Sequence, residues 1–161
     1  MAVISAKEAG GINVLAFLDM LAWSEGTDNG RQPTQDHGYD VMVGGGLFRG
    51  YADHPRQLIS LPRLGIKSSA AGRYQLLSRY WTAYRKQLDL KDFSPINQDR
   101  VALQQIKERR AIPDIQAGRI AEAVAKCRNI WASLPGAGYG QHEHKLDDLL
   151  SHYLAAGGAL A

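Results

Sequence analysis

Residues 13–26, with the sequence NVLAFLDMLAWSEG, combine a long apolar stripe with an acid and a glycine at its end. The apolar side chains recur at the three- and four-residue steps of a helix that buries one face, at Val14, Leu15, Phe17, Leu18, Leu21 and Ala22. Gly26 is the residue type that most often ends such a helix, because glycine adopts the left-handed backbone without strain. The stretch therefore predicts a core helix over residues 13–25 that carries Glu25 at its C-terminal end.

The sequence that follows this helix is unusually rich in glycine. Nine of the 17 glycines fall between Gly26 and Gly72, where short apolar pieces alternate with turns and prolines. These apolar pieces predict short strands at Val41–Val43, Leu47–Phe48 and Leu58–Leu61. Since such strands are too brief for an independent sheet, we expect a small β lobe, over about residues 27–68, that lies on a helical body.

Helical patterns return beyond residue 68. Apolar periodicity predicts further helices from Ala71 to about Leu88, from Pro95 past Ile106, from Ile120 to Trp131 and from Leu146 to Leu154. Ser94 and Pro95 are the residue types expected at the N-cap and the first position of a helix. Residues 135–140, PGAGYG, are expected to be irregular. The chain is therefore predicted to have an α+β fold that is mainly helical.

The composition is that of an ordinary globular protein. The chain has 161 residues, of which 45% are hydrophobic and 22% charged, and its formal net charge is +3. At this length we expect one domain over residues 1–161. The lone cysteine, Cys127, excludes an intramolecular disulfide framework and lies on an apolar stripe, so we expect it in the core. No run of about 20 apolar residues predicts a membrane span, and no export signal is recognised at the N-terminus.

Glu25 is the first candidate for chemistry. A carboxylate at the C-terminal end of a helix lies where the helix dipole disfavours negative charge. Partial burial beside Trp23 would add a desolvation penalty, and both effects raise the pKa of a carboxyl group. A carboxylic acid that stays protonated near neutral pH can donate a proton to a leaving-group oxygen. Position alone leaves open an ordinary exposed glutamate at a helix end.

Other polar residues offer weaker signals. His37 and Asp40 are close enough in sequence to form a hydrogen-bonded pair that organises the glycine-rich loop. His142-Glu143-His144 lacks the i, i+4 spacing that places two imidazoles on one helical face, so we expect no metal site. Tyr139, between two glycines, is either a platform for a sugar ring or an anchor for its own loop.

Four segments, taken in order, form a recognisable set. They are LAWSEGTD at 21–28, HGYD at 37–40, AGRYQLL at 71–77 and LPGAGYGQ at 134–141. With similar spacing, they resemble the lambda-type endolysins of bacteriophages, and the resemblance extends from about Phe17 to Gly158. It implies a lysozyme-like fold with an active-site cleft between the helical body and the β lobe. It also implies a lytic transglycosylase that cuts the β-1,4 bond between N-acetylmuramic acid and N-acetylglucosamine in peptidoglycan.

The same resemblance implies roles for five residues. Glu25 aligns with the essential acid of the family. Tyr74 and Gln75 align with an element that borders the cleft and contacts sugar, and Tyr139 aligns with a cleft tyrosine. Asp40 matches an acid of the cleft region and is given a supporting role. No cofactor and no metal are implied.

The resemblance also implies a cellular role in host lysis. The partner would be the glycan strands of peptidoglycan, and a phage holin would open the membrane. The protein would stay in the host cytoplasm until its release through that lesion and would then act on periplasmic peptidoglycan. We expect a monomer that neither inserts into the membrane nor binds nucleic acid. The last point follows from residues 73–161, where bases and acids interleave throughout.

Two alternatives remain open from the sequence. One is a hydrolytic muramidase on the same fold, with Asp28 or Asp40 as the second carboxylate that a glycosidase requires. Phage-type hydrolytic lysozymes have an aspartate nine residues after the glutamate and a threonine six residues later, whereas this chain has Thr34 and Asp40 at those positions. The other alternative is a non-catalytic module that binds glycan in the same cleft.

Overall fold

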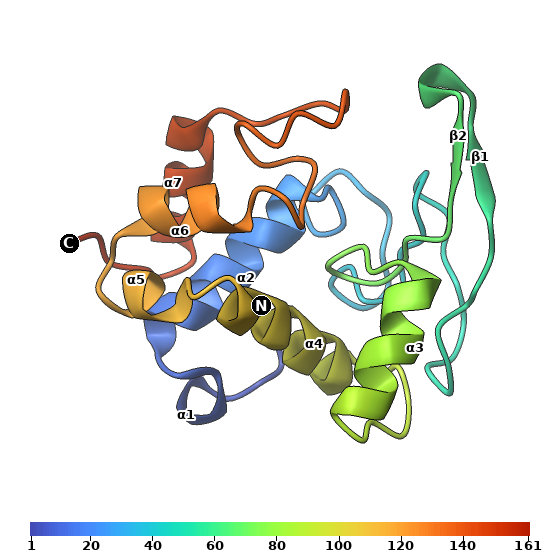
Figure 1. Ribbon diagram of the computed structural model, residues 1–161, viewed down its shortest axis with the longest axis horizontal. Coiled ribbons are helices and arrows are strands. Elements are labelled where there is room, and N and C mark those ends of the chain that lie inside the picture. Colours follow the sequence, from blue (N-terminus) through green and yellow to red (C-terminus); the bar gives the residue numbers. More distant parts are fainter.

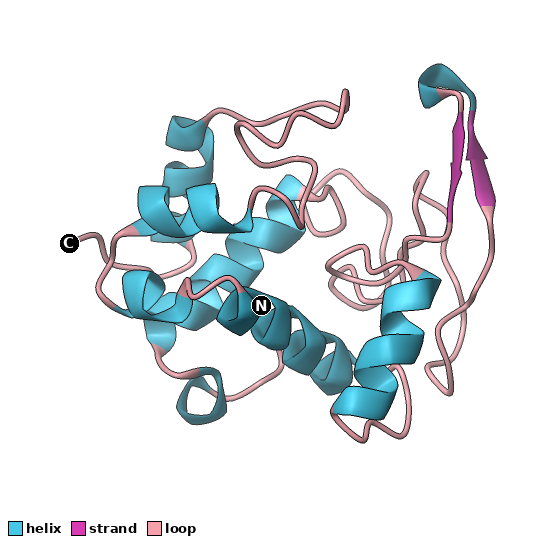
Figure 2. Ribbon diagram, viewed as in Figure 1, coloured by secondary structure: helices cyan, strands magenta, loops and turns pink.

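The computed structural model describes residues 1–161 and is dominated by helices, with a single pair of short strands (Figures 1 and 2). The helices are α1 (Ala6–Ala9), α2 (Ile12–Ser24), α3 (Ser78–Gln87), α4 (Pro95–Glu108), α5 (Ile112–Gln116), α6 (Ile120–Cys127) and α7 (Leu146–Ala155). The strands are β1 (Ile59–Leu61) and β2 (Ile66–Ser68), joined by a 3-10 turn at Pro62–Leu64. The strand pair lies at one side of the molecule, apart from most of the helices (Figure 2).

Helix α2 is the centre of the larger hydrophobic core. Most of its side chains are buried, and the helix packs against α1, α5 and α7. Its last turn ends at Glu25, whose backbone N–H donates to the carbonyl of Leu21 at 2.8 Å. Gly26 then takes a left-handed conformation with φ of 78°. The predicted core helix, with Glu25 at its C-terminal end, is confirmed.

The β lobe is less regular than the sequence predicted. The pieces expected as strands at 41–43 and 47–48 form only isolated antiparallel bridges, from Val41 to Leu47 and from Met42 to Ala71. The glycines at 44–46 separate the two pieces, and glycine weakens a strand because it adds no side chain to the packing. The third piece is confirmed as β1, which pairs with the unpredicted strand β2 in the register Ile59↔Ser68 and Leu61↔Ile66.

The helix expected to begin at Ala71 begins instead at Ser78. Residues 71–77 form a tight turn, closed by reciprocal backbone hydrogen bonds between Ala71 and Leu76. Gly72 and Gln75 have φ of 83° and 52°, which lie outside the helical region. A Cβ on Gly72 would overlap the side chain of Gln98, so the turn requires glycine there. The prediction was wrong because tertiary packing overrides a helical pattern at this point.

The helices of the C-terminal half agree more closely with those predicted from the sequence. Helix α4 begins at Pro95 with Ser94 as its N-cap, and α7 covers the predicted stretch. Helix α6 ends at Cys127, earlier than the apolar pattern to Trp131 suggested, and residues 135–140 are irregular as expected. Cys127 is fully buried, as predicted, and burial raises the pKa of its thiol to about 12.

A buried arginine joins the 71–77 turn to the end of α2. Arg73 is 1% exposed, and its guanidinium pairs with Asp19 at 2.6 Å and with Asp28 at 2.7 Å. The same group donates to the backbone carbonyl of His37. Because Asp19 belongs to α2 and Asp28 follows it, this cluster fixes the turn against the helix that carries Glu25.

Candidate active site

The environment of Glu25 is built by two distant parts of the chain. The carboxyl group follows the last turn of α2 and is partly buried. Ser133, in the loop after α6, donates a hydrogen bond from Oγ to Glu25 Oε1 at 2.9 Å. Burial disfavours the charged carboxylate and raises the pKa of Glu25 to about 7, against a smaller opposing effect of the Ser133 hydrogen bond. Glu25 can therefore carry a proton near neutral pH.

A short hydrogen-bond chain holds Ser133 in place. The hydroxyls of Ser24 and Ser133 lie 2.7 Å apart, so Ser24 can donate to Ser133 while Ser133 donates to Glu25. His144 contacts both partners, through Nε2 to the carbonyl of Ser24 at 3.0 Å and through its backbone N–H to the carbonyl of Ser133 at 2.9 Å. The end of α2 and the loop over 133–144 are thus joined beside the candidate acid.

Glu25 borders a cavity of about 180 Å³ between the strand pair and the loop after α6. The lining residues are Glu25, Val43, Leu61, Ile66, Ser68, Ala70, Gln75, Leu77, Ile130, Trp131, Ala132 and Gln141. Glu25 is the only acidic residue in this set. The cavity therefore offers one proton donor, amide and hydroxyl groups, and apolar surface, but no second carboxylate.

Gln75 and Tyr74 have opposite orientations although they are neighbours in the sequence. Gln75 lines the Glu25 cavity, and its amide donates to the carbonyls of Val41 and Gly72 at 3.1 and 3.0 Å. Tyr74 is 4% exposed, and its hydroxyl donates to Asp99 at 2.7 Å in the core. The hydroxyl of Tyr74 is therefore not available to sugar, and we revise the expected role of this side chain to packing beneath the site.

Asp40 lies away from the Glu25 cavity. Its side chain accepts hydrogen bonds from the hydroxyl of Thr34 at 2.5 Å and from the backbone N–H of Gln35 at 3.0 Å, and the residue is 6% exposed. The expected pair with His37 is wrong, since Thr34 is the partner. Asp40 organises the loop over 34–40.

Tyr139 lies on the loop after α6, which lines the Glu25 cavity on the side opposite the strand pair. Its ring is 55% exposed, while its hydroxyl donates to the carbonyl of Asn129 at 2.8 Å. The carboxylate of Glu143 accepts the backbone N–H groups of Gly136 and Gly138 at 2.9 and 3.0 Å, which holds the loop in shape. Tyr139 thus anchors its loop and presents an exposed ring, but it does not line the Glu25 cavity.

The structure adds residues that the sequence did not single out. Ser133, Trp131 and Gln141 join the site from the loop after α6, and Leu61 and Ile66 join it from the strand pair. No local motif marks them, because each is an ordinary residue type that becomes part of the site through folding.

The two carboxylates considered as a second catalytic acid have structural partners. Asp28 is paired with Arg73, and Asp40 is bonded to Thr34.

No cluster of three His, Cys, Asp or Glu side chains could hold a metal ion. None of the helices has the length and apolar character needed to cross a membrane.

Comparison with solved structures defines the class. A structure of bacteriophage lambda lysozyme complexed with a chitohexasaccharide matches with a TM-score of 0.90 and 62% sequence identity, over 100% of both chains. Lysozyme from bacteriophage lambda matches with a TM-score of 0.87 and 60% identity, again over 100% of both chains. The fold is therefore lysozyme-like α+β, as predicted, and a protonatable glutamate beside a cavity fits the peptidoglycan-cleaving enzymes of that fold.

The chain belongs to the endolysin family, whose model matches residues 15–160. The endolysin of Escherichia phage lambda is 68% identical over 146 residues, which cover 90% of this chain and 91% of that relative. The endolysin of Escherichia phage P2 is 54% identical over 158 residues, which cover 92% and 95%. The protein is thus a phage endolysin, an enzyme that cleaves the peptidoglycan of the host wall for lysis, and the predicted family is confirmed.

Proposed function

We propose that this endolysin is a lytic transglycosylase that cuts the β-1,4 bond between N-acetylmuramic acid and N-acetylglucosamine. The observation that carries the proposal is the single carboxylate, Glu25, in the cavity. A retaining hydrolase needs a second carboxyl group about 5–5.5 Å from the acid, and an inverting hydrolase needs one about 6.5–9.5 Å away to activate water. Asp28 and Asp40, the candidates for that second group, are both held by other partners.

One carboxyl group suffices when the substrate supplies its own nucleophile. Protonated Glu25 donates its proton to the glycosidic oxygen while the bond from that oxygen to C1 of the muramic acid breaks. The resulting carboxylate then accepts the proton of the C6 hydroxyl as O6 forms a bond with C1. Glu25 ends protonated again, no water is consumed, and the product is a 1,6-anhydromuramic end. Holding the sugar ring in the right geometry makes this intramolecular attack efficient.

The loops on either side of the Glu25 cavity support a substrate that is a polymer. The cavity is lined on one side by Leu61 and Ile66 of the strand pair and on the other by the loop after α6, and the glycan strand would lie between them. The proposed ligand is the glycan strand of peptidoglycan, and its exposed contacts include Gln75, Gln141 and the ring of Tyr139. We also propose that the endolysin acts as a monomer on periplasmic peptidoglycan and leaves the host cytoplasm through a holin lesion.

Analysis of muropeptide products tests the reaction type directly. Digestion of purified peptidoglycan is expected to yield products lighter by one water than those of a hydrolase, with no incorporation of oxygen from ¹⁸O-labelled water. Mass spectrometry checks both points. The control is the same peptidoglycan digested in parallel with a hydrolytic lysozyme. Reducing ends that carry ¹⁸O would contradict the proposal and would favour the hydrolytic muramidase.

The pH dependence of activity is expected to follow Glu25. Because the first step needs the protonated acid, kcat/KM should fall as pH rises through about 7, the pKa of Glu25. Ser133→Ala removes a hydrogen bond that favours the ionised form, so the pKa of Glu25 should rise and this fall in activity should move to higher pH.

The same variant should also lower kcat/KM at its optimum by about 10- to 100-fold, because a hydrogen bond to a charged group contributes about 1.5–3 kcal/mol. Ser151→Ala, on the exposed face of α7, is the matched control and should leave the profile in place. A Ser133→Ala profile that coincides with the wild-type profile would remove Ser133 from this positioning role.

A further inference from the structure

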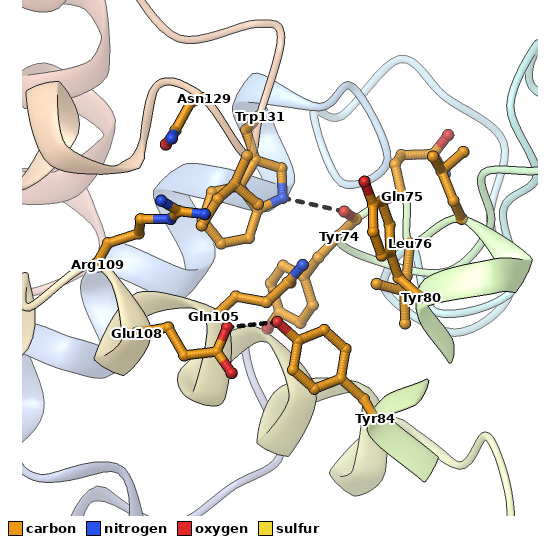
Figure 3. A pocket seen from close by; sticks show the side chains of 12 residues that line it. Tyr74, Gln75, Leu76, Tyr80, Tyr84, Gln105, Glu108, Arg109, Asn129 and Trp131 are labelled. Atoms are coloured by element: carbon orange, nitrogen blue, oxygen red, sulfur yellow. Dashed lines mark hydrogen bonds between the residues drawn. The ribbon is translucent and has the colours of Figure 1, made fainter. Parts of the chain in front are cut away.

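A second cavity, drawn in Figure 3, is lined by residues of α3, of α4 and of the loop after α6. Its volume is about 170 Å³. The two cavities share the lining residues Gln75, Leu77, Ile130 and Trp131, so they lie side by side. The second cavity, hereafter the α3–α4 pocket, also contains a carboxylate and a guanidinium, whereas the Glu25 cavity has no basic group.

The floor of the α3–α4 pocket contains a polar group with no partner in the protein. Gln105, on the last turn of α4, is 9% exposed, and its side-chain amide makes no hydrogen bond. The amide extends toward the centre of the pocket (Figure 3). Solvent reaches the amide through the pocket, and the amide makes no bond within the protein, so it is free to bond to a group that enters the pocket.

The charged groups of the pocket are not equivalent. The carboxylate of Glu108 accepts a hydrogen bond from the hydroxyl of Tyr84 at 2.6 Å and one from Gln104 at 3.3 Å. Arg109, one residue further on, forms no ion pair and no side-chain hydrogen bond. Arg109 follows Gln105 by four residues, so the two side chains lie on one face of the helix end and both border the pocket.

The unpaired N–H donors of Arg109 and Gln105 match the two acceptor oxygens of a carboxylate. A guanidinium presents a planar set of N–H donors that binds a carboxylate through two parallel hydrogen bonds, and a neighbouring amide can donate a third. Arg109 is exposed and its charge is solvated, but a carboxylate would add charge-assisted hydrogen bonds that a neutral sugar hydroxyl does not provide. The rim includes the ring of Tyr80, which is 46% exposed and can cover an aliphatic chain.

We propose that the α3–α4 pocket binds a carboxylate of the peptide stem that peptidoglycan carries on its muramic acid. Arg109 and Gln105 are the donors, and they act as specificity residues rather than as catalytic ones. The inference rests on the proposed function, since it requires a muramic acid in the neighbouring cavity. Its consequence is selectivity: strands that carry stems are cleaved in preference to bare glycan.

Three substrates distinguish binding of a stem carboxylate from binding of the lactyl carboxylate of muramic acid. Intact peptidoglycan carries stems, amidase-treated peptidoglycan carries only the lactyl carboxylate, and a chitohexasaccharide carries neither. The first two are assayed for kcat/KM, and the third is measured as a Kd by calorimetry. Arg109→Gln should lower kcat/KM on intact peptidoglycan by about tenfold and leave the other two values unchanged, because only the stem contact is lost.

Arg110→Gln is the matched control, since it removes the same charge from the adjacent position outside the pocket. Gln105→Leu is a second test, because it removes the amide donor and keeps a side chain of similar size. It should leave the thermal midpoint near that of the wild type and still lower kcat/KM on intact peptidoglycan, which a purely structural residue would not do.

Two results would overturn the inference. An Arg109→Gln loss of equal size on intact and amidase-treated strands would make the lactyl group the ligand, and no loss on intact strands would leave the pocket without this role. Failure of the proposed function is recognised separately, since it appears as reducing ends in the wild-type products whatever Arg109 does.

Discussion

Glu25→Gln is expected to abolish cleavage of peptidoglycan, with a loss of at least about 10²–10⁴-fold in kcat, the range that general acid–base catalysis contributes. Glutamine matches the shape of the protonated acid and can still bond to Ser133, but it can neither donate nor accept the transferred proton. In the proposed mechanism one group serves as acid and then as base, so both steps fail together. The turnover assay is the measurement, and the binding of chitohexasaccharide should be retained.

The same variant is expected to be more stable than the wild type at neutral pH. Burial raises the pKa of Glu25 from 4.5 to about 7, so the folded protein retains a proton that the unfolded chain has already lost between these values. The free energy of unfolding of the wild type therefore falls as pH rises from about 4.5 to 7. Since glutamine does not titrate, Glu25→Gln should be more stable by about 3 kcal/mol above pH 7 and by little below pH 4.5.

Denaturant unfolding at pH 4 and pH 8 measures this difference, with Glu122→Gln on the exposed face of α6 as the control. Stability gains of equal size at the two pH values would show that Glu25 does not ionise with a raised pKa. A Glu25→Gln protein with full lytic activity would remove Glu25 from the acid role altogether.

Arg73→Met is expected to destabilise the fold by about 3–5 kcal/mol, the cost of breaking a buried ion pair by removing one partner. Methionine fills much of the same volume, but Asp19 and Asp28 would keep their charges without the guanidinium that lies 2.6 and 2.7 Å from them. The positive charge also lies 5.3 Å from the ring centre of Tyr39, a contact that would be lost as well.

Equilibrium unfolding measures this loss, and Arg63→Met, at the exposed turn between β1 and β2, is the control. Adding Asp19→Asn and Asp28→Asn to Arg73→Met should restore part of the stability, because the uncompensated charges are then removed. A triple variant no more stable than the single one would show that the loss arises from packing rather than from charge.

Local patterns in the sequence predicted those parts of the fold in which neighbouring residues determine the structure. The core helix α2 was predicted because its apolar stripe and Gly26 are both local signals. Ser94 and Pro95 marked the start of α4 for the same reason. The 71–77 turn escaped prediction because its apolar spacing is helical, while the left-handed conformation at Gln75 depends on contacts with distant parts of the chain.

The candidate site also combines features that local sequence predicted with features that depend on contacts between distant residues. Glu25 was found from the sequence because its position at the end of a helix is a local property. Ser133, which bonds to it, lies 108 residues further along the chain, and no pattern of that range is visible in a single sequence. Asp40 and Tyr74 were chosen by resemblance, but only the folded chain reveals that their polar groups are turned to Thr34 and Asp99.

The sequence by itself determined the lysozyme-like class, the helix that ends at Glu25 and the family to which the chain belongs, because each depends on local periodicity or on ordered motifs. Only the tertiary structure decided which groups surround the acid. Burial beside a loop from the other end of the chain raises the pKa of Glu25, and packing engages the other candidate carboxylates with partners of their own. These are properties of distance and solvent exclusion, which arise when remote segments of the chain come together.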